Sequence, residues 1–381
     1  MSHLIESMEK RFSFYYGWVV VGVCSLTLFV MFGIRLSFSV FFVALIDEFG
    51  WSRADTSLIF STTMLVFMLG SAVAGWAQDR LGARVTFSLG AFVLGLGLVL
   101  SSQISTLLGM VLSYGFIAGI GITILGLSNQ ASVIARWFRQ RRGLAIGIAF
   151  AGTGLGSLVV TPLMAFVAER FHWRIGYSVL AGLAFLLIPL ILWLLKDKPS
   201  AAELEKGNQL PKTKKTAVSP PLSSQTNTWP LRKVFRTPSF WLLILAGLCT
   251  MGPIRMLTVH QLAMMTDAGI STATGAQAVG LVGAVTAVSY ILSGILSDKI
   301  GRIPTYALGG IATVAALYVI GSLSNGSPQL VWLYAVLLGI GEGSRSSLVA
   351  TVSSDMFAGP TLGAINGAVG SAYGAGTTVL P

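Results

Sequence analysis

Charge is scarce in this sequence, and so are the residues that build most catalytic and metal sites. Only 10% of its 381 residues are charged, against 54% that are hydrophobic. A soluble protein of this length would need far more charge to cover its surface, so a soluble globular domain is excluded. Both cysteines, Cys24 and Cys249, lie within apolar segments, which argues against a disulfide framework or a metal site. Because these segments contain no HExxH motif, Ser–His arrangement or paired aspartates, we predict no enzyme activity and no cofactor.

Long apolar segments take the place of the missing charge. A segment of about twenty apolar residues crosses the ~30 Å hydrocarbon core of a bilayer as a helix. The sequence has 44 glycines, and those inside the apolar segments allow helices to pack closely in lipid. We therefore predict an all-α polytopic membrane protein. Its eleven expected spans are 16–45, 56–78, 86–103, 107–134, 143–167, 175–195, 239–265, 277–297, 304–323, 329–352 and 362–381.

The basic residues are distributed unevenly along the chain, whose formal net charge is +11. If the N-terminus is cytoplasmic and the spans alternate, the cytoplasmic segments hold nearly all lysines and arginines. The opposite side then holds only Arg53, Arg170 and Arg174. This bias is the positive-inside pattern, so we interpret the basic excess as a topology signal and expect no nucleic-acid partner.

The two parts of the chain repeat each other. The segment MFGIR at 31–35 matches MGPIR at 251–255, and GWAQDRLGAR at 75–84 matches GILSDKIGR at 294–302. The glycines that correspond in the fifth and eleventh expected spans are Gly143 and Gly363, Gly147 and Gly367, Gly154 and Gly374, and Gly156 and Gly376. Agreement across separate helix pairs indicates an internal duplication.

The repeat divides the chain into an N-terminal six-helix half at 1–195, a linker at 196–238 and a C-terminal half at 239–381. The linker is rich in Lys, Pro, Ser and Thr, which is typical of a flexible polar connection. By the repeat, the second half would close some distance past Pro381, after a twelfth span. We therefore interpret the sequence as partial, in preference to a natural eleven-helix protein.

The segment 75–84 resembles the loop signature G-x-x-x-D-R/K-x-G-x-R of the major facilitator superfamily, and 294–302 resembles its second-half copy. The resemblance implies two six-helix halves with substrate bound between them near the bilayer midplane, where rocking alternates access. A carboxylate at a helix end can hold basic groups or a helix N-terminus in one state and release them in the other. The alternative is a loop that only determines topology. The candidate gating residues are Asp79, Arg80, Arg84, Asp298, Lys299 and Arg302.

A narrower resemblance is carried by YYGWVVV at 15–21 and WFRQRRGLAIGIAFAGTGLG at 137–156. Both segments resemble the monocarboxylate transporter branch, including its oxalate/formate antiporter relatives. The resemblance implies transport of small organic anions, often with a proton. One departure lies in the eighth expected helix, where Thr286 and Tyr290 stand in place of the branch's Asp and Arg. Since 361–381 is also uncharged, the usual anion ligands of the branch are absent.

Two arginines lie deep within expected spans. Arg35 and Arg255 each precede an aspartate by twelve residues, about 18 Å along a helix at 1.5 Å per residue. An arginine at that depth costs roughly 2.5–3.5 kcal/mol on insertion scales, so its presence points to function. We predict that both bind a substrate carboxylate in place of the missing arginine of the eighth helix. The alternative is that each snorkels or bonds helix carbonyls.

Three further ionisable residues are candidates for proton coupling. Glu342 and Arg345 share one face of the tenth expected helix, where they form either a static ion pair or a titrating site. His260 in the seventh span carries a proton or serves as a hydrogen-bonded structural residue. The polar residues expected to line the cavity are Tyr114, Tyr290, Tyr334 and Asn366.

Together these features predict a secondary transporter of a small organic anion, coupled to protons or working by exchange, with one chain as the functional unit. The expected location is a bacterial cytoplasmic membrane with a cytoplasmic N-terminus. The alternatives are a drug or sugar facilitator of the same fold and a non-transporting membrane sensor. The drug-antiporter signature requires Gly-Pro where this sequence has Val160-Thr161-Pro162, and a sensor would need a soluble output domain that the linker does not supply.

Overall fold

The computed structural model describes residues 15–203, 229–323 and 328–379, and all regular elements within them are helices. The predicted all-α class is therefore confirmed. The helices are α2 (Gly17–Phe49), α3 (Arg53–Leu81), α4 (Ala83–Gln103), α5 (Leu107–Met110), η1 (Val111–Ala118), α6 (Gly119–Ile124), α7 (Leu127–Trp137), α8 (Arg142–Arg170), α9 (Trp173–Leu194), α11 (Leu231–Val234), α12 (Pro238–Asp267), α13 (Thr272–Ile300), α14 (Arg302–Gly321), α15 (Pro328–Met356) and α16 (Leu362–Val379).

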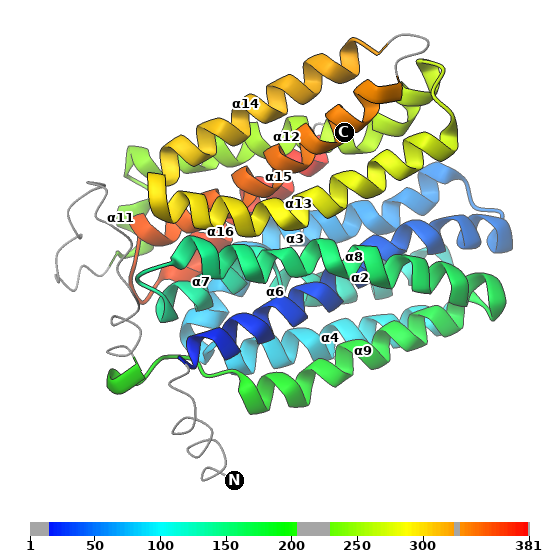
Figure 1. Cartoon of the computed structure of the whole chain (residues 1–381). Coiled ribbons are helices and arrows are strands. Elements are labelled where there is room, and N and C mark those ends of the chain that lie inside the picture. Colours follow the sequence, from blue (N-terminus) through cyan, green and yellow to red (C-terminus); the bar gives the residue numbers. More distant parts are fainter. Residues whose placement is uncertain (1–14, 204–228, 324–327, 380–381) are drawn as a thin grey trace.

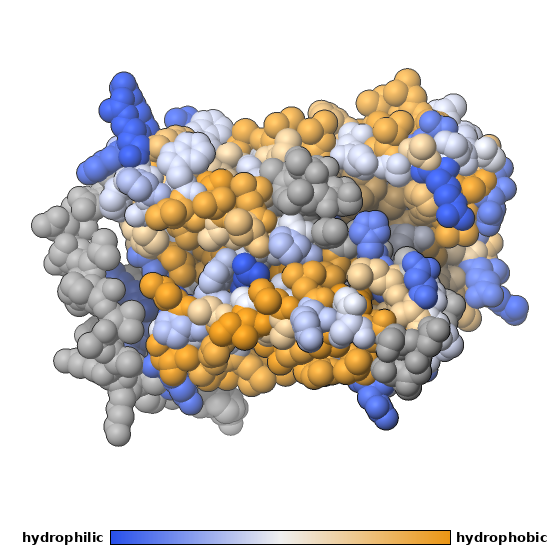
Figure 2. All heavy atoms as spheres, turned by 90° about the horizontal axis from the view of Figure 1, so that it is seen from above, coloured by the Kyte–Doolittle hydropathy of each residue, from blue (hydrophilic) through white to orange (hydrophobic). Residues whose placement is uncertain are grey.

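The long helices form two groups that lie side by side with their axes roughly aligned (Figure 1). The first group is α2–α9 and the second is α12–α16, and they meet along two seams, α3 with α16 and α8 with α13. Hydrophobic residues make up most of the middle of the face seen in Figure 2, with some hydrophilic residues among them, while the most hydrophilic residues gather toward its two ends. Such a belt is what a helical bundle presents to the hydrocarbon core of a bilayer.

Eight helices are long and apolar enough to cross a membrane, counted over the residues that the structure describes. They are α2, α3, α4, the interrupted helix Leu107–Trp137, α8, α9, α13 and α14. The helices α12, α15 and α16 do not meet this criterion over their described residues. The multi-pass prediction is confirmed, whereas the predicted count of eleven spans is not.

Glycines make the close approach along both seams possible. A β-carbon at Gly147 of α8 would overlap the backbone carbonyl oxygen of Tyr290 on α13. On the other seam, a β-carbon at Gly367 of α16 would overlap the carbonyl oxygen of Ser71 on α3. Gly147 and Gly367 are repeat partners in the sequence. The repeated glycines therefore mark the surfaces through which the two groups contact each other.

The helix expected at 107–134 is broken. A π-helical segment, η1, precedes α6, and the chain then interrupts its helical bonding at Leu125–Gly126 before α7 begins. The amide of Asn129 donates to the carbonyl oxygen of Ile124 at 2.9 Å, and that of Gln130 donates to Leu125 at 3.3 Å. From α3, Gln78 donates to the hydroxyl of Ser132 at 2.8 Å. The buried amides of Asn129 and Gln130 occupy carbonyls that the break exposes, which is how a bundle tolerates a broken helix in lipid.

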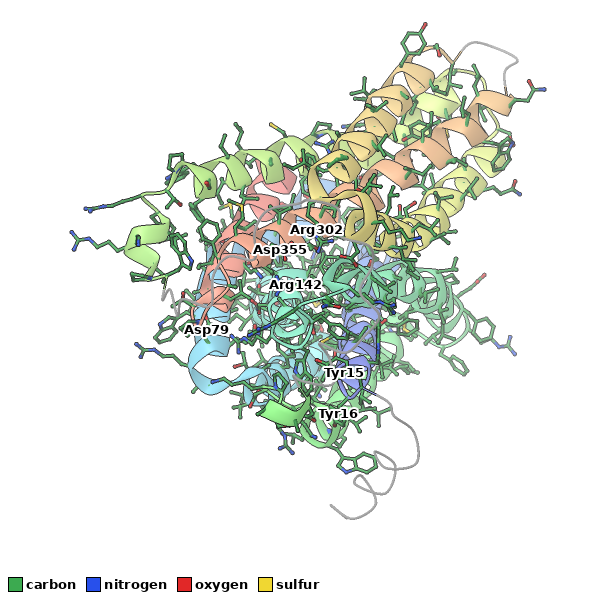
Figure 3. All side chains as sticks on the ribbon, turned by 60° about the vertical axis from the view of Figure 1, so that its left-hand side comes forward. Tyr15, Tyr16, Asp79, Arg142, Arg302 and Asp355 are labelled. Carbon is green, nitrogen blue, oxygen red and sulfur yellow. The ribbon has the colours of Figure 1, made fainter. Side chains whose placement is uncertain are left out.

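Aromatic residues hold the start of α2 in place. The Tyr15 hydroxyl donates to the carbonyl oxygen of Trp137, and the Tyr16 hydroxyl donates to that of Leu194 at 2.9 Å. The Lys196 ammonium lies 3.9 Å from the centre of the Tyr16 ring. Burial, with a smaller contribution from Glu203, raises the pKa of Tyr15 to about 12, so its phenol remains a donor at neutral pH. We call this end of the bundle, where α2 starts and α9 ends, the linker end (Figure 3).

A methyl group at the seam glycine Gly147 should weaken the contact between the two groups. We expect Gly147→Ala to destabilise the detergent-purified protein by about 1–3 kcal/mol, because the backbones of α8 and α13 must separate. The control is Gly182→Ala on α9, where a β-carbon would meet nothing within 4 Å. This control should gain up to about 1 kcal/mol from helix propensity. Equal melting temperatures for the two variants would contradict the seam assignment.

Candidate functional site

Asp79, near the end of α3, caps a helix of the other group. Its carboxylate accepts hydrogen bonds from the backbone N–H groups of Gly363, at 2.9 Å, and Ala364, at 2.8 Å. Both N–H groups belong to the first turn of α16, whose partial positive charge favours an anion. Arg136 of α7 pairs with the same carboxylate at 2.5 Å. The predicted gating residue Asp79 thus joins the two groups directly.

Asp298, near the end of α13, makes the same arrangement in the opposite direction. Its carboxylate accepts from the backbone N–H groups of Gly143, at 3.1 Å, and Leu144, at 2.9 Å, in the first turn of α8. Arg302 pairs with it at 2.5 Å. Each group therefore supplies one carboxylate that caps a helix of the other group. We call these two contacts the crossed caps.

A third carboxylate reinforces the seam between α8 and α13. Asp355, at the end of α15, pairs with Arg142 of α8 and, at 3.0 Å, with Arg302 of α14. Arg142 is only 8% exposed, and it also donates to the carbonyl oxygens of Phe138 at 2.9 Å and Ser354 at 3.1 Å. Figure 3 shows Arg142, Asp355 and Arg302 together where the two groups meet. The linker end is closed by charge-assisted bonds.

Asp79, Asp298 and Arg302 are the residues of this closure that the sequence predicts. Arg136, Arg142 and Asp355 were not predicted as site residues. Arg142 belongs to the basic doublet that carried the narrower family resemblance, and this was the one signal that pointed to it. Its partner Asp355 comes from a distant helix end, and no spacing rule connects the two positions.

The remaining predicted gating residues have other surroundings. Arg80 is exposed, and its guanidinium lies 4.4 Å from the centre of the Trp76 ring on the same helix. The backbone N–H of Arg84 donates to Asp197 at 2.8 Å, which fastens the start of α4 to the segment after α9. Lys299 is exposed near the end of α13. The described contacts of Arg80 and Arg84 therefore stay within the first group.

Arg35 lies about halfway along α2, surrounded by aromatic rings. The centres of the Phe32, Phe60 and Phe67 rings are 5.5, 5.9 and 5.9 Å from its guanidinium carbon. Its Nη2 lies 3.0 Å from the sulfur of Met64 on α3. Beside it is a pocket of about 370 Å³ between α2 and α3. The residues that line this pocket are Arg35, Leu36, Phe38, Ser39, Phe42, Ser57, Phe60 and Ser61.

The pocket lies in the half of the bundle farther from the linker end. Helix α2 starts at the linker end with Gly17, and the lining residues from Leu36 to Phe42 belong to its second half. Helix α3 runs back from the far end, and its lining residues, Ser57, Phe60 and Ser61, lie in its first third. One end of the bundle is therefore closed by ion pairs, while the other contains a pocket bordered by a cation.

The other predicted substrate ligands are not among the described residues that line this pocket. Arg255 is on α12, and its side chain lies outside the described residues. Tyr114 is buried with its ring 5.0 Å from that of Phe38. Tyr290 is also buried, with its ring 5.7 Å from that of Phe150. As substrate ligands, these residues remain predictions.

Two further expected cavity liners make buried hydrogen bonds. The Tyr334 hydroxyl donates to the side-chain oxygen of Gln261 at 3.0 Å. The Asn366 amide donates to the hydroxyl of Ser354 at 3.0 Å. Both side chains are held within the protein interior, and neither lines the pocket beside Arg35.

The proton-coupling candidates lie on the second group. Arg345 contacts the Tyr306 hydroxyl of α14 at 3.3 Å and the Cys249 carbonyl oxygen of α12 at 3.5 Å. These contacts join three helices, and a pair with Glu342 is not among the contacts of Arg345 that the structure describes. Glu342 is partly buried on α15, and His260 is exposed on α12. Their proposed titration stays a prediction.

Comparison with known proteins places this arrangement among transporters. The sequence profile of the family described as Major Facilitator Superfamily matches residues 23–381. Monocarboxylate transporter 12-B of Danio rerio is 26% identical over 370 residues, covering 90% of this chain and 74% of that protein. Monocarboxylate transporter 3 of Rattus norvegicus is 34% identical over 171 residues, covering 44% of this chain and 34% of that protein. Monocarboxylate transporter 12 of Homo sapiens is matched over 32% of its length at 29% identity.

Solved structures show the same fold at lower identity. The proton:xylose symporter XylE bound to 6-bromo-6-deoxy-D-glucose has a TM-score of 0.67 at 17% identity, covering 96% of this chain and 86% of that one. The Escherichia coli fucose:proton symporter FucP has a TM-score of 0.71 at 13% identity, covering 96% and 91%. Likeness at this level establishes the fold and says nothing of the substrate.

Neutralising a crossed cap should open the linker end. Asp298→Asn removes the charge that faces the first turn of α8 and keeps the shape of the side chain. Hydrogen bonds to a charged group contribute about 1.5–3 kcal/mol, so we expect the ratio of open to closed molecules to rise roughly tenfold or more.

Spin labels at the linker end measure this opening. The labels go on exposed Leu81 of α3 and Ile300 of α13, in a background with Cys24→Ala and Cys249→Ala. Asp298→Asn should lengthen the distance between them. The control is Asp55→Asn at the far end of α3, where the carboxylate bonds within its own first turn. An unchanged distance distribution in Asp298→Asn would refute the role of the caps in closure.

Proposed function

Since the chain belongs to the major facilitator superfamily, we propose that it moves a small organic anion across the membrane by alternating access. The observation that carries this proposal is a cation, Arg35, at the border of a pocket within an apolar helical bundle. A guanidinium presents planar paired donors that match a carboxylate. The relatives named as monocarboxylate transporters support the same substrate class.

The closed linker end supports alternating access as the mechanism. The crossed caps and the pairs of Asp355 hold both seams together at that end, while the pocket lies toward the other end. Opening the linker end must break these charge-assisted bonds, each of which contributes about 1.5–3 kcal/mol. Closure of the far end around the pocket has to compensate for this loss. The two ends are then open in alternation.

The substrate charge provides a way to couple binding to closure. Closing the far end would bury Arg35 further among the rings of Phe32, Phe60 and Phe67. A carboxylate bound at Arg35 makes charge-assisted hydrogen bonds with the guanidinium, and these bonds become stronger as closure excludes water. The loaded protein therefore closes more readily than the empty one. An exchanger needs this behaviour, since it returns only when loaded.

Proton coupling and orientation complete the proposal. Glu342 is a partly buried carboxyl on α15, and we assign it the coupling role, with His260 as the second candidate. The positive-inside rule places the linker end, with its basic residues, in the cytoplasm. The expected location is a bacterial cytoplasmic membrane. In this orientation the pocket lies toward the side of the membrane opposite the cytoplasm.

Uptake into proteoliposomes tests the substrate site. The substrates are labelled lactate, pyruvate and oxalate, and the variants are Arg35→Gln and Arg255→Gln. We expect each variant to reduce uptake at least tenfold, because the carboxylate loses a charged partner. Exposed Arg170→Gln, at the end of α8, is the matched control and should transport normally. Full activity in both test variants would eliminate the paired-arginine site, and failure of the parent on all three acids would reject this substrate class.

The same vesicles test proton coupling. An inward proton gradient should accelerate uptake by the parent, and Glu342→Gln should abolish the acceleration while counterflow exchange of substrate continues. The reason is that glutamine keeps the size of the side chain and cannot release a proton. Gradient dependence that survives in Glu342→Gln moves the coupling role to His260, which the variant His260→Asn then examines.

A further inference from the structure

We infer that the pocket beside Arg35 selects carboxylates with an aromatic body over short aliphatic acids. The inference rests on the proposed function, because it concerns the same site. It is carried by the pairing of one cation with a wall of phenylalanine rings. Phe38, Phe42 and Phe60 line the pocket together with Arg35.

The rings of this wall are held in defined positions. Phe38 stacks on Phe60 at 5.6 Å between ring centres and on Tyr114 at 5.0 Å. Phe42 meets Phe38 edge to face, at 6.1 Å and an interplanar angle of 67°. Tyr114 is itself packed against Tyr177 at 5.7 Å. These rings pack on one another in stacked and edge-to-face arrangements, which are the two that aromatic pairs prefer, so the wall is an ordered aromatic surface.

The hydrogen bonds of a guanidinium and its stacking contacts with aromatic rings point in different directions. The donors of a guanidinium lie in its plane, whereas its stacking contacts lie above and below that plane. The rings of Phe32, Phe60 and Phe67 set the position of the Arg35 group, and Arg35 is the one charged residue among those that line the pocket. A monoanion with its carboxylate at Arg35 and its body toward Phe38 and Phe42 satisfies both surfaces.

The size of the pocket favours the larger acids. Its volume of about 370 Å³ falls within the 300–1,000 Å³ range of pockets that bury drug-sized ligands. A three-carbon acid would leave much of this volume, and most of the ring surface, in contact with water. An attached phenyl group covers that apolar surface and gains the corresponding hydrophobic free energy. The hydroxyls of Ser39, Ser57 and Ser61 also line the pocket and can bond polar groups of the ligand.

Pyruvate and phenylpyruvate provide the test, because they share one head group and differ by the ring. Uptake of each labelled acid into proteoliposomes gives its KM, with 4-methyl-2-oxopentanoate as an apolar acid without a ring. We expect the KM of phenylpyruvate to be at least about tenfold below that of pyruvate, and the branched aliphatic acid to fall between them.

The variant Phe42→Leu tests the wall without changing a ring in contact with Arg35. We expect the KM ratio of pyruvate to phenylpyruvate to fall roughly 2- to 10-fold, the range of one aromatic pair. The matched control is Phe166→Leu on α8, where the ring is exposed and remote from the pocket lining, and the ratio should not change.

The outcomes separate this inference from the proposed function. Transport of pyruvate with an equal or higher KM for phenylpyruvate overturns the aromatic selection and retains the anion transporter. An unchanged ratio in Phe42→Leu also overturns it. Failure of all three acids in the parent rejects the proposed function itself. A lower KM for phenylpyruvate whose advantage shrinks in Phe42→Leu supports the inference.

Discussion

Two helix N-termini, those of α8 and α16, have their first-turn N–H groups capped by carboxylates that belong to the opposite helix group. The first N–H groups of any helix lack partners within the helix, and the helix dipole adds positive charge there. Asp298 and Asp79 satisfy both requirements from across the seams. Neither cap can form within one group alone, so the bonds exist only while the linker end is closed. The closed conformation depends on these caps.

The crossed caps can form only because the backbones of the paired helices lie very close together. A carboxylate reaches two successive N–H groups only if the helices lie nearly in contact, and the seam glycines permit this. A β-carbon at Gly143 would overlap groups of α13, and one at Gly363 would overlap groups of α3. These two glycines are also the residues whose N–H groups bond Asp298 and Asp79. One position in each repeat therefore provides both the space and the donor.

The internal duplication made the seam glycines and the carboxylates of the crossed caps predictable from the sequence. Contacts between residues far apart in the chain were not predictable in this way. Repeat spacing identified Asp79, Asp298 and the seam glycines from sequence, and apolar length identified the membrane bundle. The break at Gly126 was missed because hydropathy continues through it, and only buried amides such as Gln130 reveal how the backbone is satisfied. Arg142 and Asp355 were missed because their pairing follows from tertiary packing. Arg345 was predicted to share a helix face with Glu342, but its contacts with α12 and α14 depend on helix rotation that periodicity does not provide.

The two seams are not equivalent, despite their common origin. Within the described part of the chain, Asp79 has one ion pair, with Arg136 of its own group, whereas the α8–α13 seam adds the pairs of Asp355 with Arg142 and Arg302. Because Arg142 is buried and bonded to carbonyls of both groups, separating it leaves donors unsatisfied until water enters. Among the described contacts of the seam between α3 and α16, no buried arginine has to lose its carbonyl partners when the helices separate. Opening of the linker end should therefore begin at α3 and α16, which makes Asp79 the first cap to release and the contacts of Arg142 the last to part.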